Sequence, residues 1–162
     1  METKLYSLAK KLGLILKKRK LFIATAESCT GGMLAASITD VAGSSAYFER
    51  GFVVYSNVAK KESLGVKSQT LKKFGAVSEE IAKEMVIGVL KNSHAEVGIA
   101  ITGIAGPSGG SKNKPKGTIC FALICKRAQP ETITKYFKGN RDAVRVQAVK
   151  FALQWLLHHI TL

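Results

Sequence analysis

The sequence predicts an α/β fold, a three-layer α/β/α sandwich built on a mixed, mostly parallel sheet. Helical and strand-like patterns alternate along most of the chain, which is typical of a sheet covered by helices on both faces. Two strand-like segments follow each other near the end and add an antiparallel element. No repeat or linker interrupts the 162 residues, so we expect one domain over 1–162.

The first part of the chain predicts a helix, a strand and a second helix. Residues 3–18 place leucines and an isoleucine at helical spacing, with lysines on the other side. The apolar run LFIATA at 21–26 is typical of a buried strand. Residues 33–43 (MLAASITDVAG) then predict a helix followed by a turn.

The middle of the chain predicts a second strand and two capped helices. The strand is GFVVYS at 51–56, and Asn57 follows as the N-cap of a short helix. Ser78 caps a longer helix that runs to Asn92. Two glutamates in its first turn suit the positive end of the helix dipole.

The last part predicts three strands and a helix. EVGIAIT at 96–102 is the third strand, and a long loop rich in glycine and proline follows it. Segments 117–125 and 131–137 predict a strand pair, and Asn140 the N-cap of a final amphipathic helix.

Composition excludes several classes of protein. The apolar runs are shorter than the roughly 20 residues of a membrane helix, so we expect a cytoplasmic protein without membrane contact. Three cysteines without CxxC spacing argue against a disulfide framework and a zinc ribbon. The net charge of +14 is spread as lysine and arginine pairs without a nucleic-acid-binding motif. These observations favour a solvated basic surface over a nucleic-acid partner.

The segment 26–32 (AESCTGG) joins a predicted strand to a predicted helix. Open α/β sheets bind ligands at such carboxyl ends of strands, and glycines let a ligand approach free N–H groups. A plain tight turn is the alternative interpretation, and Cys29, with no histidine nearby in sequence, is interpreted as a packed residue. The candidate ligand-binding residues are Glu27, Ser28, Thr30, Gly31 and Gly32.

The segment ITGIAGPSGGSKNKPKG at 101–117 is the second candidate loop. Its glycine spacing matches neither GxxxxGK[ST] nor GxGxxG, which disfavours hydrolysis of a nucleoside triphosphate. Backbone donors near Thr102, Gly103 and Gly106, with lysines beyond, can hold a monophosphate. A flexible surface loop is the alternative.

The segment GSSAYFERGFVVYSNVAK at 43–60 contains Ser45, Tyr55 and Lys60. The three histidines stand in places that do not suit a Ser-His-Asp triad, which leaves a lysine as the base for a serine. With Asn57 as N-cap, Lys60 occupies the third helical position, where the helix dipole and desolvation disfavour its ammonium form. The alternative is a turn serine, a half-buried strand tyrosine and a solvated lysine.

Six motifs resemble the CinA carboxyl-terminal domain family, the nicotinamide-nucleotide amidohydrolases, here in a stand-alone form. They occur in the family's order and with similar spacing. The motifs are TAESCTGG, GSSAYFERGFVVYSNVAK, FGAVSEE, AITGIAGPSGG, KPKGT and GNRDAVR.

The resemblance implies hydrolysis of the carboxamide of nicotinamide mononucleotide, with Ser45, Tyr55 and Lys60 as catalytic residues. It implies a homo-oligomer, no cofactor and no metal. Arg141 or Arg145 is a candidate partner for the substrate phosphate. A nucleotide- or nucleic-acid-binding module without turnover, and an amidase for a related pyridine or amide substrate, remain alternatives.

Overall fold

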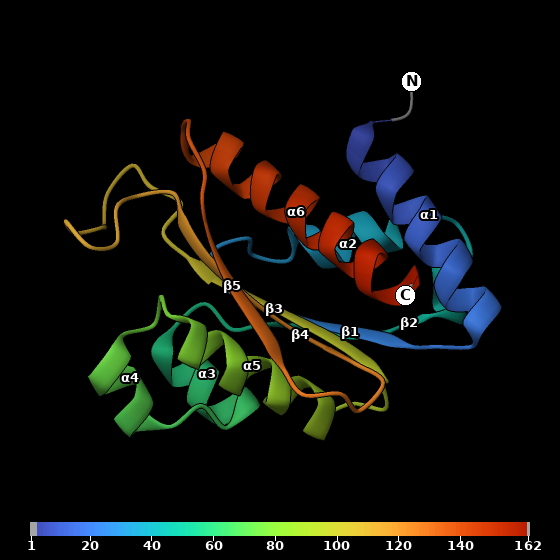
Figure 1. Cartoon of the computed structure of the whole chain (residues 1–162), viewed down its shortest axis with the longest axis horizontal. Coiled ribbons are helices and arrows are strands. Elements are labelled where there is room, and N and C mark those ends of the chain that lie inside the picture. The colour runs from blue at the N-terminus through green and yellow to red at the C-terminus, as the bar shows by residue number, and fades with distance from the viewer. Residues whose placement is uncertain (1–2, 162) are drawn as a thin grey trace.

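The computed structural model describes residues 3–161, which form a five-stranded sheet between two layers of helices (Figure 1). The helices are α1 (Lys4–Arg19), α2 (Met33–Thr39), α3 (Asn57–Leu64), α4 (Ser68–Phe74), α5 (Glu79–Lys91) and α6 (Arg141–Thr161). The strands are β1 (Ile23–Glu27), β2 (Phe48–Val53), β3 (Val97–Gly103), β4 (Thr118–Cys125) and β5 (Glu131–Tyr136), and a short 3-10 helix spans Ser44–Ala46.

The sheet has the strand order β2-β1-β3-β4-β5. β2, β1 and β3 are parallel, and β4 and β5 are each antiparallel to their neighbour. Helices α1, α2 and α6 cover one face, and α3, α4 and α5 cover the other (Figure 1). The predicted three-layer sandwich with a mixed sheet is therefore confirmed.

Two hydrophobic cores fill the space between the layers. Strand side chains alternate between them: Ile99 and Ile101 pack toward α1 and α6, whereas Ala100 packs toward α5. All five residues of β1 are buried, because its strand neighbours and both helix layers surround it. The continuous apolar runs that predicted buried strands have this physical cause.

Register defines two ends of the sheet that matter for function. Glu27 at the end of β1 pairs with Val53 of β2 and with Ile101 of β3. We call this side the carboxyl end of the sheet; the antiparallel β4 begins there, with Ile119 opposite Gly103. The amino end lies opposite, where Ile23 pairs with Phe48.

Three local features differ from the sequence prediction. β2 begins at Phe48 rather than at 51, because an edge strand tolerates the polar pair Glu49 and Arg50. Ser56, not Asn57, is the N-cap of α3, and its hydroxyl accepts a hydrogen bond from the N–H of Ala59. Helix α4 was not predicted. Within residues 3–161, no helix is long and apolar enough to cross a membrane.

Candidate active site

Lys60 is a buried lysine in the first half of α3, with only 2% of its surface exposed. Its Nζ lies 3.0 Å from the Oγ of Ser28 and 3.1 Å from the carbonyl oxygen of Tyr55. Burial lowers the pKa of Lys60, and the nearby Cys29 opposes that change only in part. An amine that loses its proton readily and touches a serine hydroxyl has the arrangement of a general base and a nucleophile.

Ser28 directly follows β1 at the carboxyl end of the sheet. Its N–H continues the sheet by donating to the carbonyl oxygen of Ile101 at 3.0 Å, which fixes the residue in space. Its side chain is buried, with 7% exposed, and Oγ also lies 3.4 Å from the carbonyl oxygen of Tyr55. The hydroxyl that faces Lys60 is therefore held by the sheet rather than by a mobile loop.

Ser45 lies far from this pair. It is exposed in the 3-10 helix that precedes β2, at the amino end of the sheet. β2 separates it from Tyr55, and six strand residues span about 20 Å. The expected Ser45–Tyr55–Lys60 cluster is therefore corrected, because within this chain the serine at Lys60 is Ser28.

Tyr55 contributes its backbone carbonyl to Lys60, rather than the hydroxyl that the sequence suggested. Its side chain is 60% exposed, and the hydroxyl accepts a hydrogen bond from Nη2 of Arg141 at 3.1 Å. The tyrosine thus joins the lysine to the start of α6.

Glu27 fixes the start of α2. Its buried carboxylate accepts hydrogen bonds from the N–H of Leu34 at 2.8 Å and of Ala35 at 3.0 Å. Each of the two carboxylate oxygens accepts one of these N–H groups in the first turn of α2, where a negative charge is favoured. Glu27 therefore holds the start of α2 in place, and its role in ligand binding stays a prediction.

The glycines of the same segment shape the turn between β1 and α2. Gly31 has φ +57° and Gly32 has φ +102°, values that side chains disfavour. Gly32 is the N-cap of α2, and no side chain caps this helix. The side chain of Thr30 is fully buried instead.

Arg145 holds the backbone of this turn from α6. Its Nε donates to the carbonyl oxygen of Cys29 at 3.1 Å and its Nη2 to that of Thr30 at 3.2 Å. Two of its donors therefore already have partners in the protein. Burial raises the pKa of Cys29 to about 12, which keeps this thiol protonated and supports its interpretation as a packed residue.

Arg141 adjoins a cavity of about 400 Å³. Its Nη1 donates to the carbonyl oxygen of Gly106 at 2.8 Å, and Lys116 and Asn140 line the same cavity. Gly106 has φ +88°, which suits a turn that brings backbone close to this space. Two positively charged side chains, Arg141 and Lys116, thus meet a glycine turn at the carboxyl end of the sheet.

Thr102 and Gly103, two other predicted ligand-binding residues, have structural contacts. The buried hydroxyl of Thr102 donates to the carbonyl oxygen of Ala76 at 2.9 Å. A Cβ at Gly103 would lie 2.3 Å from Cδ1 of Ile119, so packing requires the glycine. The structure brings Ser28, Lys60, Tyr55, Arg141 and Arg145 together, but it uses these two residues in packing.

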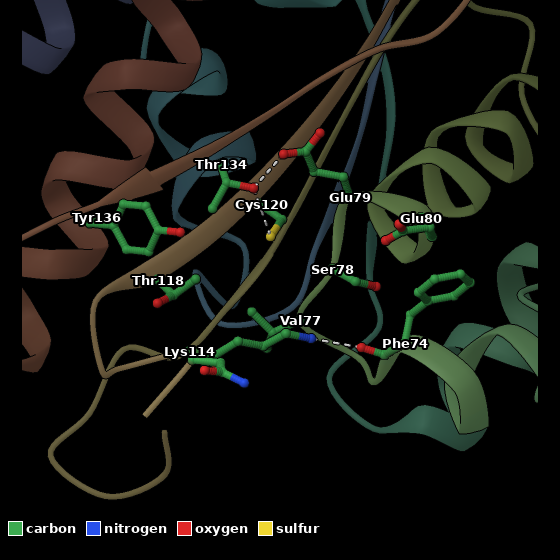
Figure 2. A pocket seen from close by; sticks show the side chains of 11 residues that line it. Phe74, Val77, Ser78, Glu79, Glu80, Lys114, Thr118, Cys120, Thr134 and Tyr136 are labelled. Atoms are coloured by element: carbon green, nitrogen blue, oxygen red, sulfur yellow. Dashed lines mark hydrogen bonds between the residues drawn. The ribbon is translucent and has the colours of Figure 1, made fainter. Parts of the chain in front are cut away.

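The larger cavities do not contain Ser28 or Lys60. One of about 480 Å³ lies beside the start of α5, and Figure 2 shows Glu79 bonded to Thr134 and Lys114 bonded to the carbonyl of Phe74. Another of about 540 Å³ lies between α3 and α5. The chemistry of the Lys60–Ser28 contact, rather than volume, identifies the candidate site.

Sequence reasoning found Ser28 as a ligand-binding residue but missed its contact with the lysine. The signal was present: Ser28 follows one parallel strand, and Lys60 lies in the helix that follows its neighbour. Neighbouring parallel strands bring such residues to the same end of a sheet.

Comparison with known proteins extends over nearly the whole chain. The family model of the CinA C-terminal domain matches residues 5–160. The nicotinamide-nucleotide amidohydrolase PncC of Escherichia coli strain K12 is 52% identical over 155 residues, which cover 96% of this chain and 94% of that protein. PncC of Enterobacter agglomerans is 49% identical over 156 residues, 96% of this chain and 95% of its own length.

Solved structures agree with this similarity. The competence/damage inducible protein CihA of Agrobacterium tumefaciens matches with a TM-score of 0.95 and 39% identity, covering 100% of this chain and 98% of that one. A CinA superfamily protein of Klebsiella pneumoniae 700603 matches with a TM-score of 0.94 and 39% identity, covering 98% and 99%.

Proposed function

Since this chain belongs to the CinA C-terminal domain family, we propose that it hydrolyses the carboxamide of nicotinamide mononucleotide to nicotinate mononucleotide and ammonia. Relatives about half identical over 96% of the chain are named nicotinamide-nucleotide amidohydrolases, which supports this reaction class. The observation that carries the chemistry is the 3.0 Å contact between Lys60 Nζ and Ser28 Oγ in a buried site.

The proposed nucleophile is Ser28, and the proposed base is neutral Lys60. One amine hydrogen remains on the carbonyl oxygen of Tyr55, which leaves the nitrogen lone pair for the hydroxyl proton of Ser28. The lowered pKa of Lys60 favours this neutral form. The oxygen of Ser28 bonds to the carboxamide carbon while its proton moves to Nζ.

The same proton then serves the leaving group. Lys60 gives it to the amide nitrogen as the C–N bond breaks, so ammonia departs and an ester joins the nicotinoyl group to Ser28. Water attacks this ester after losing a proton to Lys60, and Ser28 regains a proton as nicotinate forms. Atoms and charges balance without a metal or cofactor.

The turn after Ser28 is the proposed site of oxyanion stabilisation. The carbonyl of Cys29 points to Arg145, and in a trans peptide the N–H of Thr30 points the opposite way. Arg145 therefore orients a backbone donor in the turn beside the nucleophile. One such donor commonly contributes about 3 kcal/mol in the transition state.

The proposed phosphate contact is Arg141 with the cavity beside it. Its contacts with Gly106 and with the hydroxyl of Tyr55 place its guanidinium between two segments of the carboxyl end. Lys116 adds a second positive charge to the cavity. An arginine with this exposure can exchange its neutral partners for phosphate oxygens, which form stronger hydrogen bonds.

Ammonia release from nicotinamide mononucleotide tests the proposal. We expect Ser28→Ala to lose about a thousandfold or more in turnover. The matched control Ser45→Ala removes the other candidate hydroxyl, and its turnover should stay within about twofold of the unmodified protein. Full activity of Ser28→Ala would refute the nucleophile, and release of ammonia only from a different amide would refute the substrate.

A further inference from the structure

Tyr55 connects the two parts of the proposed active site. Its carbonyl oxygen lies 3.1 Å from Nζ of Lys60 and 3.4 Å from Oγ of Ser28. Its hydroxyl lies 3.1 Å from Nη2 of Arg141. One residue therefore touches both the proposed nucleophile and base and the proposed phosphate contact. A substrate whose carboxamide meets Ser28 and whose phosphate meets Arg141 extends alongside the side chain of this tyrosine.

The ring of Tyr55 is open to a ligand, because 60% of the side chain is exposed. Val53 and Val58, its neighbours at the end of β2 and the start of α3, are more than half exposed as well. Single exposed apolar side chains need no explanation, but several together are typical of a binding surface. An exposed apolar surface thus adjoins the contact between Lys60 and Ser28.

Other exposed aromatic side chains lie elsewhere. Among residues 3–161 they are Phe74 and Tyr136, and both line the cavity beside the start of α5 (Figure 2). The described residues that line the cavity beside Arg141 include no aromatic side chain. A widely exposed aromatic face for a ligand at the proposed active site therefore comes from Tyr55.

The charges around the proposed active site are mostly positive. Arg141 and Lys116 line the cavity, against one carboxylate, Asp142, and Arg145 holds the turn after Ser28. Nicotinamide with a substituent on its ring nitrogen is a pyridinium ion, which the positive side chains repel. The face of an aromatic ring attracts such a cation without a carboxylate.

We propose that the pyridinium ring of the substrate packs against the ring of Tyr55, which thereby selects N-substituted nicotinamides over neutral nicotinamide. This inference rests on the proposed function, which places the carboxamide at Ser28 and the phosphate at Arg141. It gives the side chain of Tyr55 a binding role instead of the catalytic role that the family resemblance implies. Because Lys60 contacts the backbone of Tyr55, a change of the side chain leaves that contact in place.

Two ligands of nearly equal size test the proposal. One is neutral nicotinamide, and the other is nicotinamide methylated on its ring nitrogen, which is a cation. Dissociation constants are measured by ligand-observed NMR with Ser28→Ala, so that the proposed reaction does not consume the ligands. We expect the cation to bind about fivefold more tightly or better. Tyr55→Phe, added to Ser28→Ala, keeps the ring and should keep this preference, whereas Tyr55→Leu should reduce it below about twofold.

Two control variants show whether the preference comes from this ring. Tyr136→Leu removes an exposed tyrosine that lines the other cavity, and it should keep the preference. Asp142→Asn removes the carboxylate that lines the cavity beside Arg141, and it should keep the preference too. Equal affinity of Ser28→Ala for the two ligands, or no binding of either, would overturn the proposal. An unchanged preference in Tyr55→Leu, or its loss in Asp142→Asn, would overturn it as well.

Ammonia release from nicotinamide mononucleotide by the unmodified protein reports separately on the proposed function. Without that release, but with a preference that depends on the ring of Tyr55, the function fails and the binding role of Tyr55 holds. With that release, but without the preference, the function holds and the role of Tyr55 fails.

Discussion

Replacing Lys60 by methionine separates the proposed catalytic role of this lysine from its effect on stability. Methionine fills similar space without a charge, so the variant should lose turnover and yet unfold less readily at neutral pH. The reason is that folding forces a lysine with a normal pKa in the unfolded chain into a site that lowers its pKa. That cost is absent from the variant.

The magnitude follows from proton linkage. Below the pKa of an unfolded lysine, about 10.4, and above the lowered folded pKa, the unfolded chain holds one more proton than the folded protein. The free energy of unfolding of the unmodified protein therefore rises by about 1.4 kcal/mol per pH unit across that range. The free energy of unfolding of the Lys60→Met variant has no such dependence on pH, so its stability advantage over the unmodified protein shrinks as pH increases. The two hydrogen bonds lost, about 1 kcal/mol each, offset part of the advantage.

Urea unfolding of both proteins at several pH values between 7 and 10 measures this difference. Lys61→Met is the control, because Lys61 is the next residue of α3 and is exposed. We expect its stability curve to run parallel to that of the unmodified protein. A constant difference between Lys60→Met and the unmodified protein over this range would refute a lowered pKa in the folded state.

Two further predictions concern the segment around Ser28. In Glu27→Gln, the N–H of either Leu34 or Ala35 faces an NH2 group instead of an oxygen. We expect urea titration to show a free energy of unfolding lower by about 2–3 kcal/mol. Turnover should also fall. An unchanged midpoint would contradict the structural role of this carboxylate. Cys29, with a pKa of about 12, should react only slowly with iodoacetamide at pH 8 in the folded protein. Mass spectrometry measures this labelling. Rapid labelling with loss of activity would contradict a buried, protonated thiol.

The fold was largely predictable because burial left a clear pattern in the sequence. β1, β3 and β4 are buried on both faces and appear as continuous apolar runs. Ser78 and Asn140 were predicted as helix caps, and both side chains accept the expected hydrogen bonds. Helix α4 escaped prediction because it is short and its N-cap residue, Lys67, makes no side-chain cap.

The site was predictable only in part. Lys60 was identified because no histidine suits the role of base and because a helix start and desolvation disfavour its ammonium form; burial does lower its pKa. The serine was assigned to Ser45 because the resemblance to the CinA C-terminal domain family grouped it with Tyr55 and Lys60. Ser45 precedes β2 and Tyr55 follows it, so the two residues lie at opposite ends of the sheet. Ser28 follows the parallel strand β1 and therefore lies at the same end as Tyr55. Distance along the chain shows neither fact.

The contacts of α6 have a consequence for how the protein matures. Arg145 reaches back 116 residues to Cys29, and Arg141 reaches back 86 residues to Tyr55. A ribosome therefore releases the segment that contains Ser28 long before the helix that orients it exists. Sheet pairing of β1 with β2 can precede this helix, but the turn beside Ser28 cannot take its final form until α6 docks. Under the proposed mechanism, catalytic competence is thus among the last properties that the newly made chain acquires.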